Sequence, residues 1–321
     1  MKKIHPLSRR DFIKKAGLTA SVLPIAPFLN CTAAAAESGA DQLEIHVFSK
    51  HLQFLNYQDM TAVVADIGYN GVDLAVRPGG HVLPERVTDD LPNAVEALRK
   101  QGLLVNLMTT AVTNSLDATH RQVLETAAAQ GITDYRMGYL DYPKEGTIPK
   151  ALAGFQEQME ELAIFNKQLG IRGAYQNHAG KRVGAMIWDI YHLLEKADPT
   201  ALGCQYDIRH AMVEGGMSWE VGLRLIRPHI HTIVLKDFVW QKVDGQWKVV
   251  NVPLGEGMVD FPGYFRILKE YGIHVPASMH LEYDLGGAEH GAKELDKATQ
   301  KTVLAAMKRD LMRAREMWAE A

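Results

Sequence analysis

The feature that most constrains this chain is a regular alternation of strand-like and helix-like segments from residue 43 to residue 318. Short apolar runs alternate with longer segments in which apolar residues recur at helical spacing. Several predicted helices are closed by a glycine, the residue that most often ends a helix: Gly68, Gly102, Gly131, Gly170 and Gly272. This order predicts a parallel sheet, because parallel strands need a crossover segment between them.

Eight strand–helix units can be recognised along the chain. The predicted strands lie at 43–48, 71–76, 103–108, 134–138, 171–176, 202–207, 232–235 and 275–282. The predicted helices lie at 59–67, 91–100, 120–130, 155–169, 183–196, 219–226, 261–271 and 301–318. Eight units favour a closed (β/α)8 TIM barrel over an open sheet. We therefore predict the α/β class, with a single barrel domain over residues 42–321.

One insertion interrupts the alternation after the seventh strand. Two runs with strand character, 240–243 and 246–250, flank the pair Asp244-Gly245. An Asp-Gly pair between strand-like runs predicts a β-hairpin with a tight turn. The hairpin follows a strand, on the face where such barrels place their active sites. It is therefore either a lid or a solvent-exposed decoration.

Residues 1–37 are predicted to be a twin-arginine signal peptide that precedes the barrel. Arg9-Arg10 stand in the pattern SRRDFIK, an apolar stretch follows at 16–29, and a run of small residues ends the segment at 33–36. This is the order of regions in a secretory signal. The apolar stretch is shorter than the roughly 20 residues of a membrane span and contains prolines. The segment predicts export to the periplasm.

The cysteines and the charge balance narrow the class further. Cys31 is a candidate lipidation site, although the residues before it fit a lipobox poorly, and cleavage after the alanines is the alternative. Beyond the signal only Cys204 remains, so no intramolecular disulfide is expected. The formal net charge is −3 and no basic block follows the signal. A nucleic-acid partner is therefore not expected.

Polar side chains stand at the ends of three predicted strands. Gln176 ends the fifth strand, Asp207 ends the sixth, and Glu282 ends the eighth, in the run MHLEY. In a TIM barrel the C-terminal strand ends meet at the catalytic mouth. Carboxylate and amide oxygens suit hard divalent cations such as Mg²⁺ or Mn²⁺. The sequence therefore predicts a metal site built from these three residues.

Two histidines follow these predicted ligands. His178 lies two residues after Gln176 and so shares its side of the strand. His210 lies three residues after Asp207, at the start of a predicted glycine-rich loop over 214–216. Both are candidate catalytic residues, because histidine is the side chain that most often transfers protons near neutral pH.

Three further residues are candidates for binding substrate. Lys236 ends the seventh strand and is either a cation for an oxyanion or the partner of a carboxylate. Arg77 and His81 flank a Pro-Gly-Gly turn after the second strand. Two adjacent glycines allow a ligand to approach the backbone closely.

The motifs QNH (176–178), DIRH (207–210), VLKD (234–237), PLGEGMVDF (253–261) and HLEY (280–283) together resemble those of the xylose-isomerase-like sugar isomerase and epimerase barrels. The resemblance covers nearly the whole chain after the signal. It implies that Asp207 and Glu282 are metal ligands and that Lys236-Asp237 match the typical pair on strand seven. It also implies a carbohydrate substrate.

Two positions depart from the resembled pattern. Gln176 stands where a ligating glutamate is usual, and Val234 stands where a ligating histidine is usual. An amide oxygen ligates more weakly than a carboxylate, and valine has no donor atom. The remaining ligand would then come from His178, His210 or water, or the metal is absent.

The resemblance also implies a mechanism. In the resembled epimerases two carboxylates flank the substrate, and one removes a proton next to a carbonyl group while the other returns it. Gln176 cannot act as a base, which leaves Glu282 as the predicted base with His178 or His210 as the acid. We predict a metal-assisted sugar isomerase or epimerase that works through an enediolate.

Two alternatives remain open from the sequence. The same proton abstraction would serve a lyase or hydratase that acts on 3-keto-glycosides. The two departures would also fit a sugar-binding barrel that has lost catalysis. The endonuclease branch of the resembled superfamily is disfavoured, because the chain lacks the extra histidines of that branch and a basic face.

Overall fold

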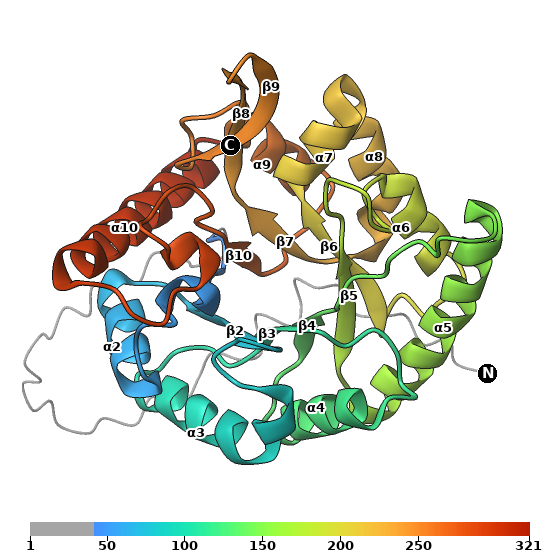
Figure 1. Cartoon of the computed structure of the whole chain (residues 1–321), viewed down its shortest axis with the longest axis horizontal. Coiled ribbons are helices and arrows are strands. Elements are labelled where there is room, and N and C mark those ends of the chain that lie inside the picture. Colours follow the sequence, from blue (N-terminus) through green and yellow to red (C-terminus); the bar gives the residue numbers. More distant parts are fainter. Residues whose placement is uncertain (1–41) are drawn as a thin grey trace, which may run out of the picture. The chain divides into compact units, whose positions relative to one another are not determined.

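The structure, a computed structural model, describes residues 42–321, which form a closed barrel of parallel strands ringed by helices (Figure 1). The barrel strands are β1 (Ile45–Phe48), β2 (Gly71–Val76), β3 (Leu107–Thr110), β4 (Asp134–Arg136), β5 (Arg172–Gln176), β6 (Leu202–Asp207), β7 (Ile230–Leu235) and β10 (Ala277–Met279). Strands adjacent in the chain pair with one another, and β10 closes the barrel between β7 and β1. The predicted (β/α)8 fold is confirmed.

The helices between these strands are α2 (Tyr57–Ile67), α3 (Val87–Lys100), α4 (Ala118–Ala129), α5 (Ile148–Leu169), α6 (Ile187–Leu194), α7 (Ile208–Gly215), α8 (Trp219–Ile226), α9 (Phe261–Glu270) and α10 (Lys297–Glu320). Several begin at a short polar side chain. Asn56, Asp117 and Asp260 each accept a hydrogen bond from the backbone N–H three residues later. Such caps pair backbone donors that the first helical turn leaves unpaired, which is why these helices start where they do.

The interior of the barrel is packed with polar and apolar side chains. The Asp73 carboxylate accepts hydrogen bonds from Thr109 Oγ1 at 3.1 Å and from Ser278 Oγ at 2.6 Å, and all three residues are fully buried. The apolar core lies between the strands and the helices that cover them. A barrel filled in this way is no channel, so chemistry is confined to its C-terminal mouth.

The predicted hairpin is present after β7, as β8 (Asp237–Val243) and β9 (Gln246–Val252). Asp244 has φ 51° and Gly245 has φ 80°, as the two central positions of a tight hairpin turn require. The base of the hairpin is tied to the barrel mouth. Asn251 Oδ1 accepts from Arg209 Nη2 at 2.7 Å, and Asn251 Nδ2 donates to the backbone oxygen of Glu282 at 3.1 Å.

Three predicted boundaries are wrong. The predicted loop after Asp207 is the helix α7, which Asp207 caps through the N–H of His210 and which Gly216 ends. The predicted third strand, 103–108, begins four residues later, because Leu104 makes only an isolated bridge to Gly71. The predicted eighth strand, 275–282, is only the short β10, so Glu282 lies on the loop beyond it.

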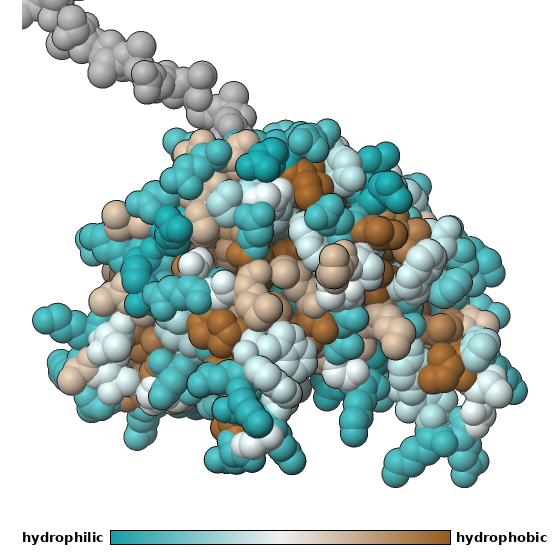
Figure 2. All heavy atoms as spheres, turned by 90° about the horizontal axis from the view of Figure 1, so that it is seen from above, coloured by the Kyte–Doolittle hydropathy of each residue, from teal (hydrophilic) through white to brown (hydrophobic). Residues whose placement is uncertain are grey.

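The predicted signal peptide and Cys31 lie outside the described residues. Within residues 42–321, no helix is long and apolar enough to cross a membrane. Cys204 is buried and forms no disulfide in this part of the chain. On the face seen in Figure 2, hydrophobic residues lie scattered among hydrophilic ones.

Candidate active site at the barrel mouth

Four polar side chains meet at the C-terminal ends of neighbouring strands, and we call them the mouth cluster: Gln176, Asp207, Lys236 and Glu282. The first two end β5 and β6, Lys236 follows β7, and Glu282 lies three residues beyond β10. Gln176 Nε2 lies 2.7 Å from Asp207 Oδ2. Lys236 Nζ lies 3.1 Å from the same oxygen and 3.2 Å from Glu282 Oε2. The structure thus brings together four residues that the sequence singled out.

Lys236 is the centre of this cluster. Besides the two carboxylates, its Nζ lies 2.7 Å from His210 Nε2. Its side chain is 2% exposed. Burial opposes its charge, but the carboxylates of Asp207 and Glu282 outweigh that effect and raise the pKa of Lys236 above its ordinary value. The residue is therefore a buried ammonium ion at neutral pH, and of the two roles that the sequence left open, the pairing with carboxylates is the one observed.

Glu282 is held by two lysines. Its Oε1 accepts a hydrogen bond from Lys50 Nζ at 3.2 Å, and its Oε2 accepts one from Lys236 Nζ at the same distance. Burial alone would raise its pKa, but Lys236, His280 and Lys50 together hold the pKa of Glu282 well below its usual range. A carboxylate stabilised in this way remains ionised and is a weak base.

The orientation of the Gln176 amide is fixed by its neighbours. Its Oε1 accepts hydrogen bonds from Tyr139 Oη at 2.6 Å and from Arg136 Nη1 at 2.9 Å. An arginine can only donate, so the amide oxygen must face Arg136 and the NH₂ group must face Asp207. The oxygen of Gln176 therefore points away from the carboxylate beside it.

His178 and His210 lie face to face at the rim of the cluster. Their ring centroids are 4.0 Å apart, at an angle of 37°. The ring of His210 lies between two cations, with Nδ1 2.9 Å from Arg209 Nη1 and Nε2 against Lys236. Burial, and after it the charge of Lys236, lowers the pKa of both histidines, that of His210 most strongly. Both rings are therefore neutral at pH 7.

Three further cations line the mouth. Lys50 Nζ and Arg77 Cζ lie 5.6 Å and 5.3 Å from the centre of the Phe48 ring. Arg136 is buried at the end of β4. Burial and the nearby charge of Arg136 lower the pKa of Arg77. Sequence reasoning missed Lys50, Arg136 and Tyr139. The pattern already used, a polar residue at or just after the end of a strand, would have identified Lys50 and Arg136.

Asp237 organises the loop that carries the motif PLGEGMVDF. Its Oδ1 accepts hydrogen bonds from the N–H groups of Phe238 and Val259, at 2.8 and 3.1 Å. Its Oδ2 accepts from those of Gly255 and Gly257, at 3.0 and 2.9 Å. A side chain at Gly257 would collide with this carboxylate, which explains why glycine stands there. Asp237 thus fixes the return of the chain from the hairpin to α9.

His81 has local partners of its own. Its Nε2 lies 3.1 Å from the backbone oxygen of Leu52, and its ring lies beside that of Tyr57. Burial lowers its pKa to about 4. These contacts join the turn after β2 to the segment before α2. The imidazole of His81 therefore has a structural role. Its predicted role in binding substrate stays a prediction.

The residues at the mouth do not fit a divalent metal. In the described part of the chain, no three His, Cys, Asp or Glu side chains lie close enough together to hold one. Val234 has no donor atom, the Gln176 oxygen is turned toward Arg136, and the Lys236 ammonium lies between the two carboxylates. The predicted metal ligands Gln176, Asp207 and Glu282 and the predicted Mg²⁺ or Mn²⁺ thus remain sequence predictions that this geometry does not support.

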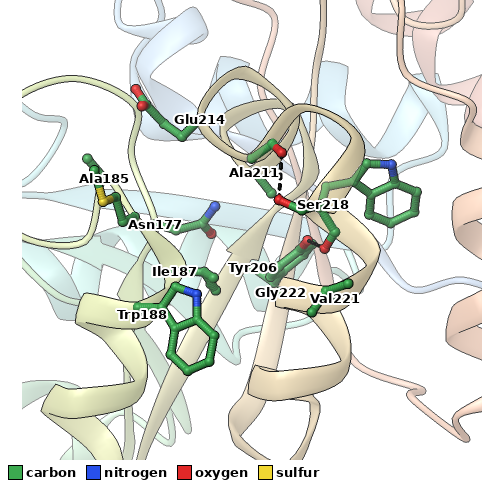
Figure 3. Close-up of a pocket in the computed structure, with 13 residues that line it drawn as sticks. Asn177, Ala185, Ile187, Trp188, Tyr206, Ala211, Glu214, Ser218, Val221 and Gly222 are labelled. Carbon is green, nitrogen blue, oxygen red and sulfur yellow. Dashed lines mark hydrogen bonds between the residues drawn. The ribbon is translucent and has the colours of Figure 1, made fainter.

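A second, mostly apolar cavity of about 220 Å³ opens between α6 and the pair α7–α8 (Figure 3). Trp188 and Val221 stand at its edge and are half exposed. Its one carboxylate, Glu214, accepts a hydrogen bond from the N–H of Gly180 at 2.9 Å. Asn177 lines the cavity, but its side chain is bonded to the backbone of Asp207 on both sides. The cavity therefore lacks the paired ionisable groups of the mouth.

The chain belongs to the family described as Xylose isomerase-like TIM barrel, whose pattern matches residues 61–317. This agrees with the barrel and with the motifs at its mouth. No curated protein matches the sequence.

Several solved structures share the fold at low sequence identity. The IOLI protein with a bound zinc atom has a TM-score of 0.63 and 13% identity, over 86% of this chain and 99% of that chain. A D-allulose 3-epimerase from Methylomonas sp. has a TM-score of 0.61 and 15% identity, over 85% and 98%. A probable 3-DHS dehydratase, AsbF from Bacillus anthracis, has a TM-score of 0.60 and 13% identity, over 84% and 99%. At such identities the likeness establishes the fold.

Proposed function

We propose that the protein is an enzyme that removes a proton next to the carbonyl group of a small sugar or keto-sugar and so forms an enediolate. The observation that carries this proposal is a neutral histidine, His178, beside a mouth lined with cations. Removing such a proton needs a base, and the negative charge that develops on the carbonyl oxygen needs positive charge nearby. Membership of the family supports a carbohydrate substrate.

We assign the role of base to His178 in place of Glu282. The two lysines on Glu282 make its carboxylate a weak base. His178 Nδ1 lies 2.9 Å from the backbone oxygen of Ala179. A carbonyl oxygen can only accept, so Nδ1 carries the hydrogen and Nε2 carries the lone pair that takes up a proton. The lowered pKa keeps this lone pair available at pH 7.

His210 takes a positioning role in this proposal. Both of its ring nitrogens face cations, Arg209 and Lys236, so neither is free to serve a substrate. Lys50 contacts only one carboxylate oxygen, at 3.2 Å, and an ammonium has three N–H donors. Lys50 and the guanidinium of Arg77 are therefore the groups best placed to stabilise an enediolate oxygen.

A single base favours isomerisation. His178 takes the proton from one carbon, the C–H electron pair enters the enediolate, and the same ring returns the proton to the former carbonyl carbon. The hydroxyl proton passes between the two enediolate oxygens, so that the old carbonyl becomes a hydroxyl and the old hydroxyl becomes the new carbonyl. Inversion at one carbon needs a second acid on the opposite face, and both ring nitrogens of His210 already face cations. The second candidate is a lyase on 3-keto-glycosides, in which the same enediolate expels a group from the next carbon.

Exchange of the α-proton with deuterated water tests the proposal. Aldoses, ketoses and 3-keto-glycosides are incubated with the enzyme in D₂O and followed by proton NMR. We expect exchange with at least one class, and we expect His178→Asn to slow it by about 10²–10⁴-fold. His192→Asn is the matched control, because the side chain of His192 is 52% exposed. Sugar binding without exchange would identify a non-catalytic barrel, and full exchange by His178→Asn would exclude this base.

A further inference from the structure

The mouth cluster already contains a positive charge at its centre. We propose that the ammonium group of Lys236 is the resident cation of this site and that the protein takes no divalent metal there. The role of this cation in catalysis rests on the proposed proton transfer. Its presence in place of a metal can be tested without a substrate.

The contacts of Lys236 Nζ are those of an ion in a coordination site. Its neighbours are Asp207 Oδ2 at 3.1 Å, Glu282 Oε2 at 3.2 Å and His210 Nε2 at 2.7 Å. An ammonium has three N–H donors, and the two carboxylate oxygens accept from two of them. Two carboxylate oxygens and an imidazole nitrogen are also the donor types that bind zinc and manganese. The lysine therefore uses the atoms that a metal would need.

The strand register explains how the lysine reaches this position. Val234 is paired with Asp207 of β6 on one side and with Ser278 of β10 on the other. A ligating side chain at position 234 would thus stand between β6, which carries Asp207, and β10, whose following loop carries Glu282. Valine offers no donor there. Lys236 follows two residues later, on the same side of the chain, and its long side chain reaches both carboxylates.

The amide of Gln176 supports the same arrangement. Its NH₂ group donates to Asp207 Oδ2 at 2.7 Å, the oxygen that also contacts Lys236. Its oxygen is fixed against Arg136 and Tyr139. To ligate a metal shared with Asp207, the amide would have to turn over, and its NH₂ group would then face the guanidinium of Arg136. Two donors in contact would leave buried polar groups unpaired.

The carboxylates of the cluster are paired without a metal. Asp207 and Glu282 carry two negative charges, which Lys236 and, from outside the cluster, Lys50 neutralise. A divalent ion would meet an ammonium at the centre of its own site and would have to expel it. The repulsion between two such cations in a buried position is large.

Metal binding by the purified protein tests this inference. Protein grown with added Mn²⁺ and Zn²⁺ is analysed for its metal content, and Mn²⁺ binding is then titrated by electron paramagnetic resonance. We expect the parent to hold far less than one equivalent. We expect Lys236→Ala and Lys236→Met to bind Mn²⁺ at least about 100-fold more tightly than the parent, because the repelling charge is gone. Lys242→Ala, at an exposed lysine of the hairpin, is the matched control and should behave as the parent.

A stoichiometric metal in the parent would overturn the inference, as would folded Lys236 variants that bind Mn²⁺ no better than the parent. Circular dichroism establishes that the variants are folded. If the Lys236 variants are unfolded, the metal content of the parent protein alone tests the inference. Loss of α-proton exchange on chelation would contradict this inference and leave the proposed function intact. Metal-free protein that exchanges no proton on any sugar would contradict the proposed function and leave this inference intact.

Discussion

The buried pair of Lys236 and Asp207 makes a quantitative prediction about stability. The side chain of Asp207 is 0% exposed and that of Lys236 is 2% exposed. Removing one partner of a buried pair costs about 3–5 kcal/mol, because the remaining charge is left uncompensated. Asp207 keeps hydrogen bonds from Gln176 Nε2 and from the N–H of His210. We therefore expect Lys236→Met to lower the free energy of unfolding by about 3 kcal/mol, the low end of that range.

A double-mutant cycle separates the pair from the loss of packing. Asp207→Asn keeps the size of the side chain and removes its charge. The double variant Asp207→Asn/Lys236→Met contains neither charge, so it should be more stable than Lys236→Met alone. We expect a coupling energy of about 2 kcal/mol, within the range for residues in contact. Urea unfolding followed by circular dichroism at pH 7 measures all four proteins.

The pH dependence of this loss has a definite sign. The folded-state pKa of Lys236 is raised above its ordinary value of 10.5. Its contribution to stability is therefore complete below pH 10.5 and is lost only as the pH rises through the folded pKa. The charge of Lys236 itself should therefore contribute equally at pH 6 and pH 8, and any difference in the cost of Lys236→Met between them should come from His178 and His210, whose pKa Lys236 lowers. The reasoning would be refuted if Lys236→Met cost less than about 0.5 kcal/mol, the effect of an ordinary surface substitution. It would also be refuted if the costs of the two single substitutions simply added in the double variant.

Three further predictions follow from other parts of the chain. Asp237→Ala leaves four backbone N–H groups, two of them buried, without their acceptor and should cost about 3 kcal/mol in urea unfolding. Asp66→Ala, at an exposed position of α2, should cost under about 0.5 kcal/mol, and equal costs would contradict this. Burial lowers the pKa of His178, and the base is lost as the pH falls through that pKa. The acid limb of kcat/KM should therefore lie below pH 6.5, and a limb above it would exclude His178. We also propose export by the twin-arginine pathway, so replacing Arg9 and Arg10 by lysine should retain the protein in the cytoplasm. Cell fractionation measures this, and an unchanged periplasmic yield would contradict it.

The barrel could be predicted because its signals are local. Gly68 and Gly170 end α2 and α5 with φ of 101° and 69°, a conformation that glycine adopts at little cost. β2 and β6 have the predicted bounds, since an apolar run fixes a fully buried strand. β10 is shorter than its apolar run, because a strand ends where its neighbours stop pairing, and that depends on residues far away in the sequence.

The mouth could be predicted only in part. Position at a strand end was enough to find Gln176, Asp207 and Lys236. The direction in which each side chain donates or accepts was not predictable, because it depends on residues from other strands. Arg136 of β4 sets the orientation of the Gln176 amide, and Lys50 after β1 holds Glu282. The proposed preference for His178 over Glu282 as the base rests on such contacts, those of Lys50 and Lys236 with Glu282 and of Ala179 with His178.

The glutamine at position 176 bears directly on the charge of the site that Lys236 occupies. A glutamate there would place a third buried carboxylate against Asp207 Oδ2, the oxygen that Gln176 Nε2 contacts at 2.7 Å, and Arg136 Nη1 would face its other oxygen. An amide can donate to Asp207, which an ionised glutamate cannot. Gln176 thus stabilises the carboxylate that the lysine holds, which supports the proposal that Lys236 is the cation of this site.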